Sequence, residues 1–315
     1  MAQEPDGLHV VDRYNEKTSL RDLWKNSPGF LVCGGPSLRA LDLGFLRCRG
    51  VVSLGVNNVA GLAPVSAWTF SDPPEKFHHG VHLDPGCLSF VPIPKLRKKI
   101  RVKQPDGGWV YPGARVRDCP GVVGYERSCE FRPETFLTSR GATWGNNDKG
   151  VQATGGPKLL FSMFLGIRLL HYLGVRRVYM LGVDFGMDPL GDANEQYAFG
   201  QRREPGACET NNGSYIQAAK WLAELRPIFD AAGFNLFNCN PSSRLEVFDH
   251  VPYEDAILDA TRHCREPFDL SGWYEKKPKH DTAKETAGSL SRRERRRLRR
   301  IQRRERLDKA ESRKG

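Results

Sequence analysis

The residues of this chain best suited to phosphate and hydroxyl chemistry follow short apolar runs. After the first run, at 29–34, the sequence holds two glycines, a proline and a serine: Gly34, Gly35, Pro36 and Ser37. Adjacent glycines let a backbone approach a phosphate closely, and the Ser37 hydroxyl can cap a following helix or donate to a phosphate oxygen. The spacing matches neither G-x-G-x-x-G nor a Walker loop. A tight turn with a helix cap therefore explains it equally well.

Polar side chains also end three later apolar runs. Asn57 and Asn58 follow the run 51–56, and an amide can both donate to and accept from a base or a ribose. Asp72 and Asp184 end two more runs and can bind a sugar hydroxyl, hold a metal-bound water or act as a base. An Asn-rich turn and helix N-caps are the simpler alternatives for these positions.

The apolar runs predict alternating strands and helices. Strands are expected at 29–34, 51–56, 66–71, 176–185 and 235–240, a helix or turn at 38–46, and helices at 155–174 and 214–232. This order is typical of a Rossmann-like α/β fold, a mostly parallel sheet with helices on both faces. Ligands of such sheets bind at the carboxyl ends of the strands, where the polar residues fall.

The predicted organisation is a Rossmann-like catalytic domain with additions at both ends. The domain covers 25–265 and includes an irregular Pro- and Gly-rich lid or insertion at about 75–145. A segment at 1–24 precedes it as an N-terminal extension. A linker at 266–290 and an Arg-rich tail at 291–315, disordered or helical, follow it.

Composition narrows the class of protein. The sequence has no apolar run of 18 residues and no signal-peptide pattern at its start, which predicts a cytoplasmic protein without a membrane span. The eight cysteines are scattered without a C-x-x-C pair, and the histidine cluster at 78–82 is interpreted as loop. No protein metal site is predicted.

The net charge of +11 belongs mainly to the tail. Residues 291–315 hold 13 Arg and Lys against four acids, a net of +9, so the other 290 residues carry only +2. Such an arm can bind DNA or RNA through phosphate contacts without reading bases. Nucleic acid is therefore a predicted partner, with a solvated tail of no binding function as the alternative.

The motifs, taken in order, resemble those of the bacterial sialyltransferase family and its wider relatives, which include the "domain of unknown function 115" group and an archaeal pterin pyrophosphokinase. The matching motifs are CGGPSL, a strand ending in NN, SDP, Thr-Gly-Gly before an apolar helix, YLGVRRVYMLGVDF, YAF, SYI and CNPSS. They span about residues 29–245. The resemblance implies a Rossmann-like domain with a lid and a donor nucleotide bearing a sugar or a diphosphate.

The resemblance also implies roles for residues at the matching positions. It assigns phosphate binding to Gly34–Ser37, nucleotide binding to Asn57 or Asn58, a donor-contacting turn to Thr154 and Gly155, an acid to Asp184 and a lid tyrosine to Tyr197. The family's histidine base has no counterpart, since no histidine lies between 172 and 249. The base is then expected among the acids Asp184, Asp188 and Asp72. Tyr215 lies near the expected place, but its ordinary pKa of about 10 makes it a poor base.

These observations predict a nucleotide-sugar-dependent glycosyltransferase. The donor is a nucleotide-sugar, with a divalent ion, Mg²⁺ or Mn²⁺, as an optional partner. A nucleic-acid acceptor, such as a hydroxymethylated base in phage-type DNA modification, fits the basic tail. Two alternatives stay open: an ATP- and Mg²⁺-dependent diphosphotransferase, and a non-catalytic nucleic-acid-associated protein of the same fold.

Overall fold

The computed structural model describes residues 7–70, 86–104, 107–127, 132–142, 162–199, 204–262 and 264. By its internal contacts the chain divides into two units, Met1–Cys264 and Arg265–Gly315, and every described residue belongs to the first. The predicted site residues Asp72, Thr154 and Gly155 and the tail 291–315 lie outside the described residues.

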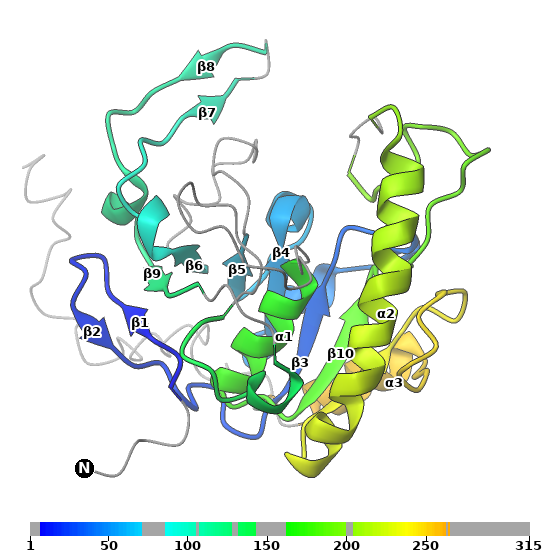
Figure 1. Cartoon of the computed structure of the whole chain (residues 1–315). Helices are drawn as coiled ribbons and strands as arrows, with labels where there is room; N and C mark the ends of the chain where they lie inside the picture. Colours follow the sequence, from blue (N-terminus) through cyan, green and yellow to red (C-terminus); the bar gives the residue numbers. More distant parts are fainter. Residues whose placement is uncertain are drawn as a thin grey trace, which may run out of the picture. The chain divides into compact units, whose positions relative to one another are not determined.

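A nine-stranded, mostly parallel sheet forms the centre of the first unit (Figure 1), which confirms the predicted α/β fold class. The spatial order is β11-β10-β3-β4-β5-β6-β9-β1-β2. The first seven strands are parallel: β11 (Asn235–Asn238), β10 (Arg177–Leu181), β3 (Pro28–Val32), β4 (Val52–Val56), β5 (Ala67–Thr69), β6 (Leu88–Pro92) and β9 (Val122–Tyr125). At one edge, β1 (Val10–Val11) and β2 (Lys17–Thr18) run antiparallel.

The strand order reverses at β3. From β3 the chain proceeds outward through β4, β5, β6 and β9, and then returns to the other side of β3 as β10. In the register of this pair Arg177 faces Pro28 and Leu181 faces Val32, so the two strands end side by side. The carboxyl ends at such a reversal are where open parallel sheets bind their ligands.

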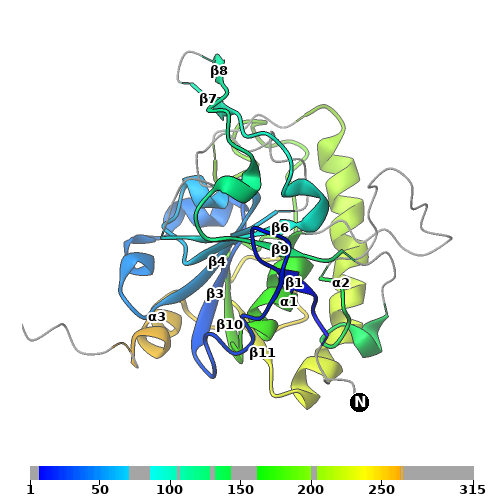
Figure 2. The same cartoon turned by 90° about the vertical axis from the view of Figure 1, so that its left-hand side faces the viewer.

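Buried side chains cover both faces of the sheet, because alternate residues of a strand point to opposite sides. On one face Leu31 and Val178 pack in the core cluster of α1 (Ser162–Tyr172) and α2 (Ala207–Ala231). On the other face Phe30 and Tyr179 pack with the 3-10 turns and α3 (Tyr253–Thr261). Figure 2 shows the helices on the two sides of the sheet.

Close packing of α1 on the sheet depends on Gly166. A Cβ atom at this position would lie 2.5 Å from Leu31 Cδ1, on the central strand β3. Real Cβ atoms do not approach a carbon so closely, so a larger residue would push α1 away from the sheet.

The predicted strands are present. The segment after β3, where a helix or turn with Ser37 as a possible cap was predicted, differs from the prediction in its cap. It forms two 3-10 turns, η1 (Pro36–Ala40) and η2 (Gly44–Arg47). The N-cap of η1 is Gly35 and carries no side-chain bond, so the predicted capping role of Ser37 is wrong. The helix predicted at 214–232 begins earlier, at Ala207, because polar residues fill its first turns and hide the helical period.

The segment 75–145, predicted to be irregular, contributes β6 and β9 to the main sheet, so that part of the prediction is wrong. Each of these strands has only four or five residues and adjoins Gly or Pro, which weakened its signal. The same segment contains the 3-10 turns η6 (Ile93–Lys95) and η7 (Val116–Asp118). It also forms a separate two-stranded ribbon of β7 (Val102–Lys103) and β8 (Trp109–Val110). The predicted extension 1–24 likewise contains β1 and β2.

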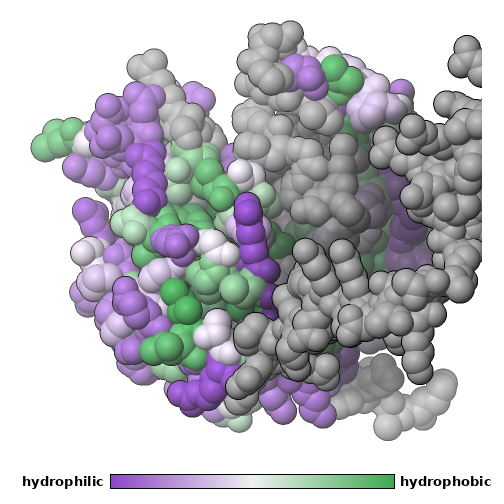
Figure 3. Space-filling view, turned by 180° about the vertical axis from the view of Figure 1, so that it is seen from behind, coloured by the Kyte–Doolittle hydropathy of each residue, from purple (hydrophilic) through white to green (hydrophobic). Residues whose placement is uncertain are grey.

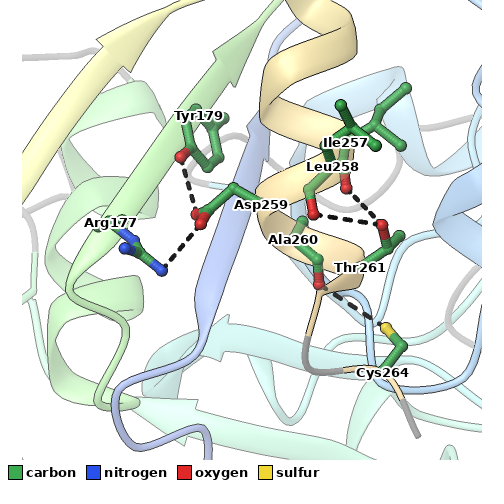
Figure 4. Close-up of polar contacts among 8 residues, drawn as sticks. All are labelled: Arg177, Tyr179, Ile257, Leu258, Asp259, Ala260, Thr261 and Cys264. Carbon is green, nitrogen blue, oxygen red and sulfur yellow. Dashed lines mark hydrogen bonds and ion pairs between the residues drawn. The ribbon is translucent and has the colours of Figure 1, made fainter. Parts of the chain in front are cut away.

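A partly buried polar cluster attaches α3 to the sheet (Figure 4). The Tyr179 hydroxyl donates to Asp259 Oδ2 at 2.8 Å, and Arg177 pairs with Asp259 Oδ1 at 3.1 Å. Burial and this bond raise the pKa of Tyr179. The cluster fixes a short helix that the sequence analysis did not predict.

The outer surface is mixed in character. Seen from behind in Figure 3, small apolar patches lie among hydrophilic residues. In the described part of the chain, no helix is both long enough and apolar enough to cross a membrane.

Candidate functional site

A cavity of about 180 Å³ opens at the reversal of strand order, between the ends of β3 and β10. Residues after β3, β4 and β10 form most of its wall, together with α1, α2 and the segment 196–199. The lining residues are Cys33, Gly34, Gly35, Pro36, Val56, Asn57, Ser162, Met163, Gly182, Val183, Asp184, Phe185, Gly186, Gln196, Tyr197, Phe199 and Tyr215. The cavity therefore brings together most of the predicted site residues that the structure describes.

Asp184 is the acid at the centre of this site. Its Oδ2 accepts a hydrogen bond from Ser37 Oγ at 2.9 Å, and its Oδ1 accepts from the Ser37 N–H at 3.3 Å. Asn240, which follows β11, donates its Nδ2 to Oδ1 at 3.0 Å. Three strands thus contribute to holding one carboxylate in a fixed orientation.

Gly35 is a requirement of this arrangement. A Cβ atom on Gly35 would overlap Asp184 Oδ2 and would lie 2.5 Å from the Gly182 carbonyl oxygen. Its φ of −71° and ψ of 153° are open to any residue, so the need for glycine is steric. The glycine pair was predicted to admit a phosphate, whereas in this structure Gly35 makes room for the side chain of Asp184.

The backbone donors of the glycine-rich turn are largely occupied. The Gly35 N–H donates to Gly182 O at 2.9 Å, and the Ser37 N–H and hydroxyl both donate to Asp184. Pro36 has no N–H. Within the described part of the chain only the Gly34 N–H of this turn has no hydrogen-bond partner, which leaves it for a ligand oxygen.

Burial raises the pKa of both Asp184 and Cys33 in the site. Desolvation raises the pKa of Asp184, while the hydrogen bonds from Ser37 and Asn240 oppose the rise. Burial raises the pKa of the Cys33 thiol to about 12, so the thiol is protonated at neutral pH and is not a nucleophile. A carboxylate with a raised pKa is a stronger proton acceptor than an ordinary aspartate.

The segment 196–199 forms one wall of the cavity, and hydrogen bonds attach this segment and the preceding turn to the glycine-rich turn and η1. The Ala198 N–H donates to Gly34 O at 3.0 Å, and Arg39 donates to the Tyr197 and Asn194 carbonyl oxygens at 2.5 and 3.1 Å. The Tyr197 and Phe199 rings are stacked, with centroids 5.3 Å apart and planes 9° apart. This pair offers a flat aromatic surface beside the cavity.

The two predicted asparagines have different positions. Asn57 lines the cavity in a left-handed conformation with φ of 55°, and its Oδ1 accepts from Ser162 Oγ at 3.0 Å. Its Nδ2 has no partner among the residues that the structure describes and remains able to donate to a ligand. Asn58 is not part of the cavity wall.

Asp188 lies outside the cavity. It is exposed, and its Oδ1 accepts from the Leu190 N–H at 2.9 Å, which stabilises a turn. Among the acids in the described part of the chain, Asp184 is the one in the cavity wall. The described residues contain no group of three His, Cys, Asp or Glu side chains placed to hold a metal ion.

Tyr215 and Arg244 at the site, like Asn240, were not among the sequence-predicted site residues. Tyr215 of α2 lines the cavity with its ring 5.2 Å from that of Phe185, and burial raises its pKa to about 12. The Arg244 side chain packs against Gly186 of the cavity wall. A Cβ atom on Gly186 would lie 2.6 Å from Arg244 Cδ. The Arg244 backbone N–H donates to Asp184 O at 2.9 Å. The Arg244 guanidinium forms no ion pair with any described residue. The sequence could have indicated Arg244 only through its position directly after the CNPSS motif.

Comparison with protein-family models finds no match, and comparison with curated protein sequences finds none either. Among solved structures, the chain is similar to "Structure of MAf glycosyltransferase from Magnetospirillum magneticum AMB-1", with 18% sequence identity and a TM-score of 0.38. The similarity covers 78% of this chain and 36% of that chain. The matched region thus spans about a third of that chain's length, and a likeness of this size assigns no activity.

Proposed function

We propose that the chain is a nucleotide-sugar-dependent glycosyltransferase whose donor binds in the cavity between β3 and β10. The observation that carries this proposal is the position of Asp184, a fixed and partly desolvated carboxyl group at the reversal of strand order. Ligands of parallel α/β sheets bind at this position, and transfer of a sugar to a hydroxyl needs a base there.

The donor phosphates would be held by the Gly34 N–H and the Arg244 guanidinium. Hydrogen bonds to charged groups contribute about 1.5–3 kcal/mol each. Asn57 would donate to a ribose or base oxygen, and the stacked rings of Tyr197 and Phe199 would contact a flat base. The cavity of about 180 Å³ is smaller than the roughly 300–1,000 Å³ of pockets for drug-sized ligands, so it accommodates part of such a donor.

In the proposed reaction, the acceptor hydroxyl oxygen forms a bond to the anomeric carbon of the donor. The bond from that carbon to the phosphate oxygen breaks, and its electron pair leaves with the phosphate, next to Arg244. Asp184 accepts the hydroxyl proton while Ser37 and Asn240 hold its carboxylate. Tyr215 is protonated at neutral pH and acts as a hydrogen-bond donor.

The same carboxylate supports a second candidate, a Mg²⁺-dependent diphosphotransferase. A carboxylate repels a nearby phosphate unless a proton or a divalent ion lies between them. Asp184 therefore fits a donor bound with Mg²⁺ or Mn²⁺ in either reaction. A nucleic-acid acceptor, such as a modified DNA base, remains part of the proposal through the basic tail 291–315.

The first experiment is a thermal-shift screen against CMP-, UDP-, GDP- and ADP-sugars and ATP, each with and without Mg²⁺. A ligand at 100 times its dissociation constant stabilises a protein by roughly 2.7 kcal/mol. Stabilisation by one nucleotide-sugar, lost in Arg244→Gln and kept in the control Arg262→Gln on the exposed end of α3, supports the proposal. Stabilisation by Mg-ATP alone favours the diphosphotransferase, and no stabilisation by any of them favours a non-catalytic protein.

The second experiment tests the base. Asp184→Asn keeps an oxygen and a similar shape but does not accept the proton, so we expect donor binding to persist while turnover falls at least 100-fold. Unchanged turnover in Asp184→Asn would contradict the assigned role of Asp184.

A further inference from the structure

A second cavity, of about 370 Å³, lies at the other end of the sheet, where the turn between β1 and β2 meets the segment that follows β6. Its lining contains three arginines and no carboxylate: Arg13, Tyr14, Asn15, Ile93, Pro94, Leu96, Arg97 and Arg117. We call it the arginine cavity. In the sheet, β4 and β5 lie between β3, which ends at the Asp184 cavity, and β6, whose following segment lines the arginine cavity.

The three arginines are only weakly engaged by the protein itself. Arg13 lies 5.2 Å from the centre of the Tyr14 ring, and Arg117 Nε lies 3.8 Å from Asp118 Oδ1 in an ion pair in which both side chains are about half exposed. Arg97 makes no ion pair or side-chain hydrogen bond to any described residue. Exposed ion pairs of this length contribute at most about 1 kcal/mol, so Arg117 is available to a stronger anion.

Apolar and aromatic side chains complete the arginine cavity. Ile93, Pro94 and Leu96 contribute apolar surface, and Tyr14 is 73% exposed beside it. A purely ionic site for a free inorganic anion needs no such surface. A base attached to a phosphate fits this combination, because aromatic rings stack on bases and arginines bind phosphate oxygens in pairs.

The surface next to the arginine cavity, on and around the β7–β8 ribbon, also combines cations with aromatic rings. Figures 1 and 2 both show the β7–β8 ribbon projecting from the body of the molecule, directly after the segment that lines the arginine cavity. Arg101 lies 4.1 Å from the centre of the Trp109 ring, and Tyr111 at the end of the ribbon is 62% exposed. Lys98 and Lys99 are also exposed. Cations interleaved with aromatic rings are typical of surfaces that bind single-stranded nucleic acid.

We propose that the arginine cavity binds the phosphate backbone of a nucleic-acid strand, with the β7–β8 ribbon extending the contact. This proposal does not rest on the glycosyltransferase proposal, because the two cavities share no residue. It also places a nucleic-acid contact on the folded body of the protein, separate from the tail 291–315.

The test is fluorescence anisotropy of a labelled single-stranded oligonucleotide with the full-length protein, over a range of salt concentrations. The variant carries Arg13→Ser, Arg97→Ser and Arg117→Ser. The control carries Arg47→Ser, Lys220→Ser and Arg262→Ser, three exposed cations elsewhere on the surface. Both proteins lose three positive charges and keep the tail, so the control measures the general effect of charge.

We expect the arginine-cavity variant to bind on the order of tenfold more weakly at low salt. We also expect its plot of log affinity against log salt to be less steep by about 2, because each single-strand phosphate contact contributes about 0.7 to the slope. The control should change less than half as much. Circular dichroism checks the fold. Arg97→Ser alone, which removes no ion pair or side-chain hydrogen bond to a described residue, repeats the test if the triple variant unfolds.

Equal losses in the two triple variants would overturn the proposal, since binding would then depend on net charge alone. Unchanged binding by the arginine-cavity variant would overturn it as well. Inorganic phosphate that stabilises the wild type but not the arginine-cavity variant, while both proteins bind the oligonucleotide equally, would overturn it too and would identify a small-anion site.

Discussion

Replacement of Gly35 by alanine is a direct test of how the Asp184 site is built. The new Cβ would overlap Asp184 Oδ2 and lie 2.5 Å from Gly182 O, whereas real Cβ contacts stay beyond 3.0 Å. The carboxylate must then move by more than about 1 Å, which breaks its 2.9 Å bond from Ser37 Oγ. Loss of a charged hydrogen bond and overpacking together predict a destabilisation of about 2–5 kcal/mol.

Urea denaturation of Gly35→Ala measures this loss, and Gly213→Ala is its matched control. Gly213 lies within α2 and nothing stands within 4 Å of its missing Cβ, so alanine should stabilise the helix by about 0.5–1 kcal/mol. In an Asp184→Ala background the cost of Gly35→Ala should fall by at least about 1 kcal/mol. A Gly35→Ala protein within about 0.5 kcal/mol of wild type, or costs that simply add, would refute the reasoning.

Three further predictions concern titration and hydrogen bonding. Burial raises the pKa of Asp184, so its contribution to stability is present below about pH 4 and is lost as the pH rises through its folded pKa. The unfolding free energy of Asp184→Asn should therefore rise relative to that of the wild type as the pH increases above about 4. A difference that stays constant with pH would count against the burial argument. Tyr179→Phe removes the donor to Asp259 and should cost about 1–2 kcal/mol in denaturation, whereas Tyr14→Phe on the surface should cost less than about 0.5 kcal/mol. Tyr215→Phe should weaken donor binding about fivefold in calorimetry. This loss of affinity should be the same at every pH between 6 and 9, because Tyr215, with a pKa of about 12, stays protonated throughout. A loss of affinity that varies with pH would indicate a different role for Tyr215.

The strands around the site could be predicted because each is buried on both faces and is therefore continuously apolar. The run at 29–34 and the run ending at Asp184 both have this pattern, and each is followed by polar residues. No pattern within either run predicts that these two strands are neighbours in the sheet. Their adjacency depends on the pairing of β3 with β10, a contact between residues far apart in the sequence.

The bonding within the site could not be predicted, since it depends on distances across strands. Ser37 was expected to face a phosphate or cap a helix, whereas it donates to Asp184. Asn240 and Arg244 reach the site from the turn after β11 and were identified only in the structure. The short strands β6 and β9 were missed because four or five residues carry too little periodicity to separate a strand from a loop.

The reversal of strand order at β3 also determines when the candidate site can form during synthesis. About 145 residues separate β3 from its partner β10, so at about 5–20 residues per second the ribosome takes roughly 7–30 s to supply that partner. Until then one edge of β3, a fully buried strand in the finished protein, has unpaired backbone groups. We therefore expect the nascent chain to need protection from aggregation at this edge, and Asp184 to meet the turn that holds it only after β10 is made.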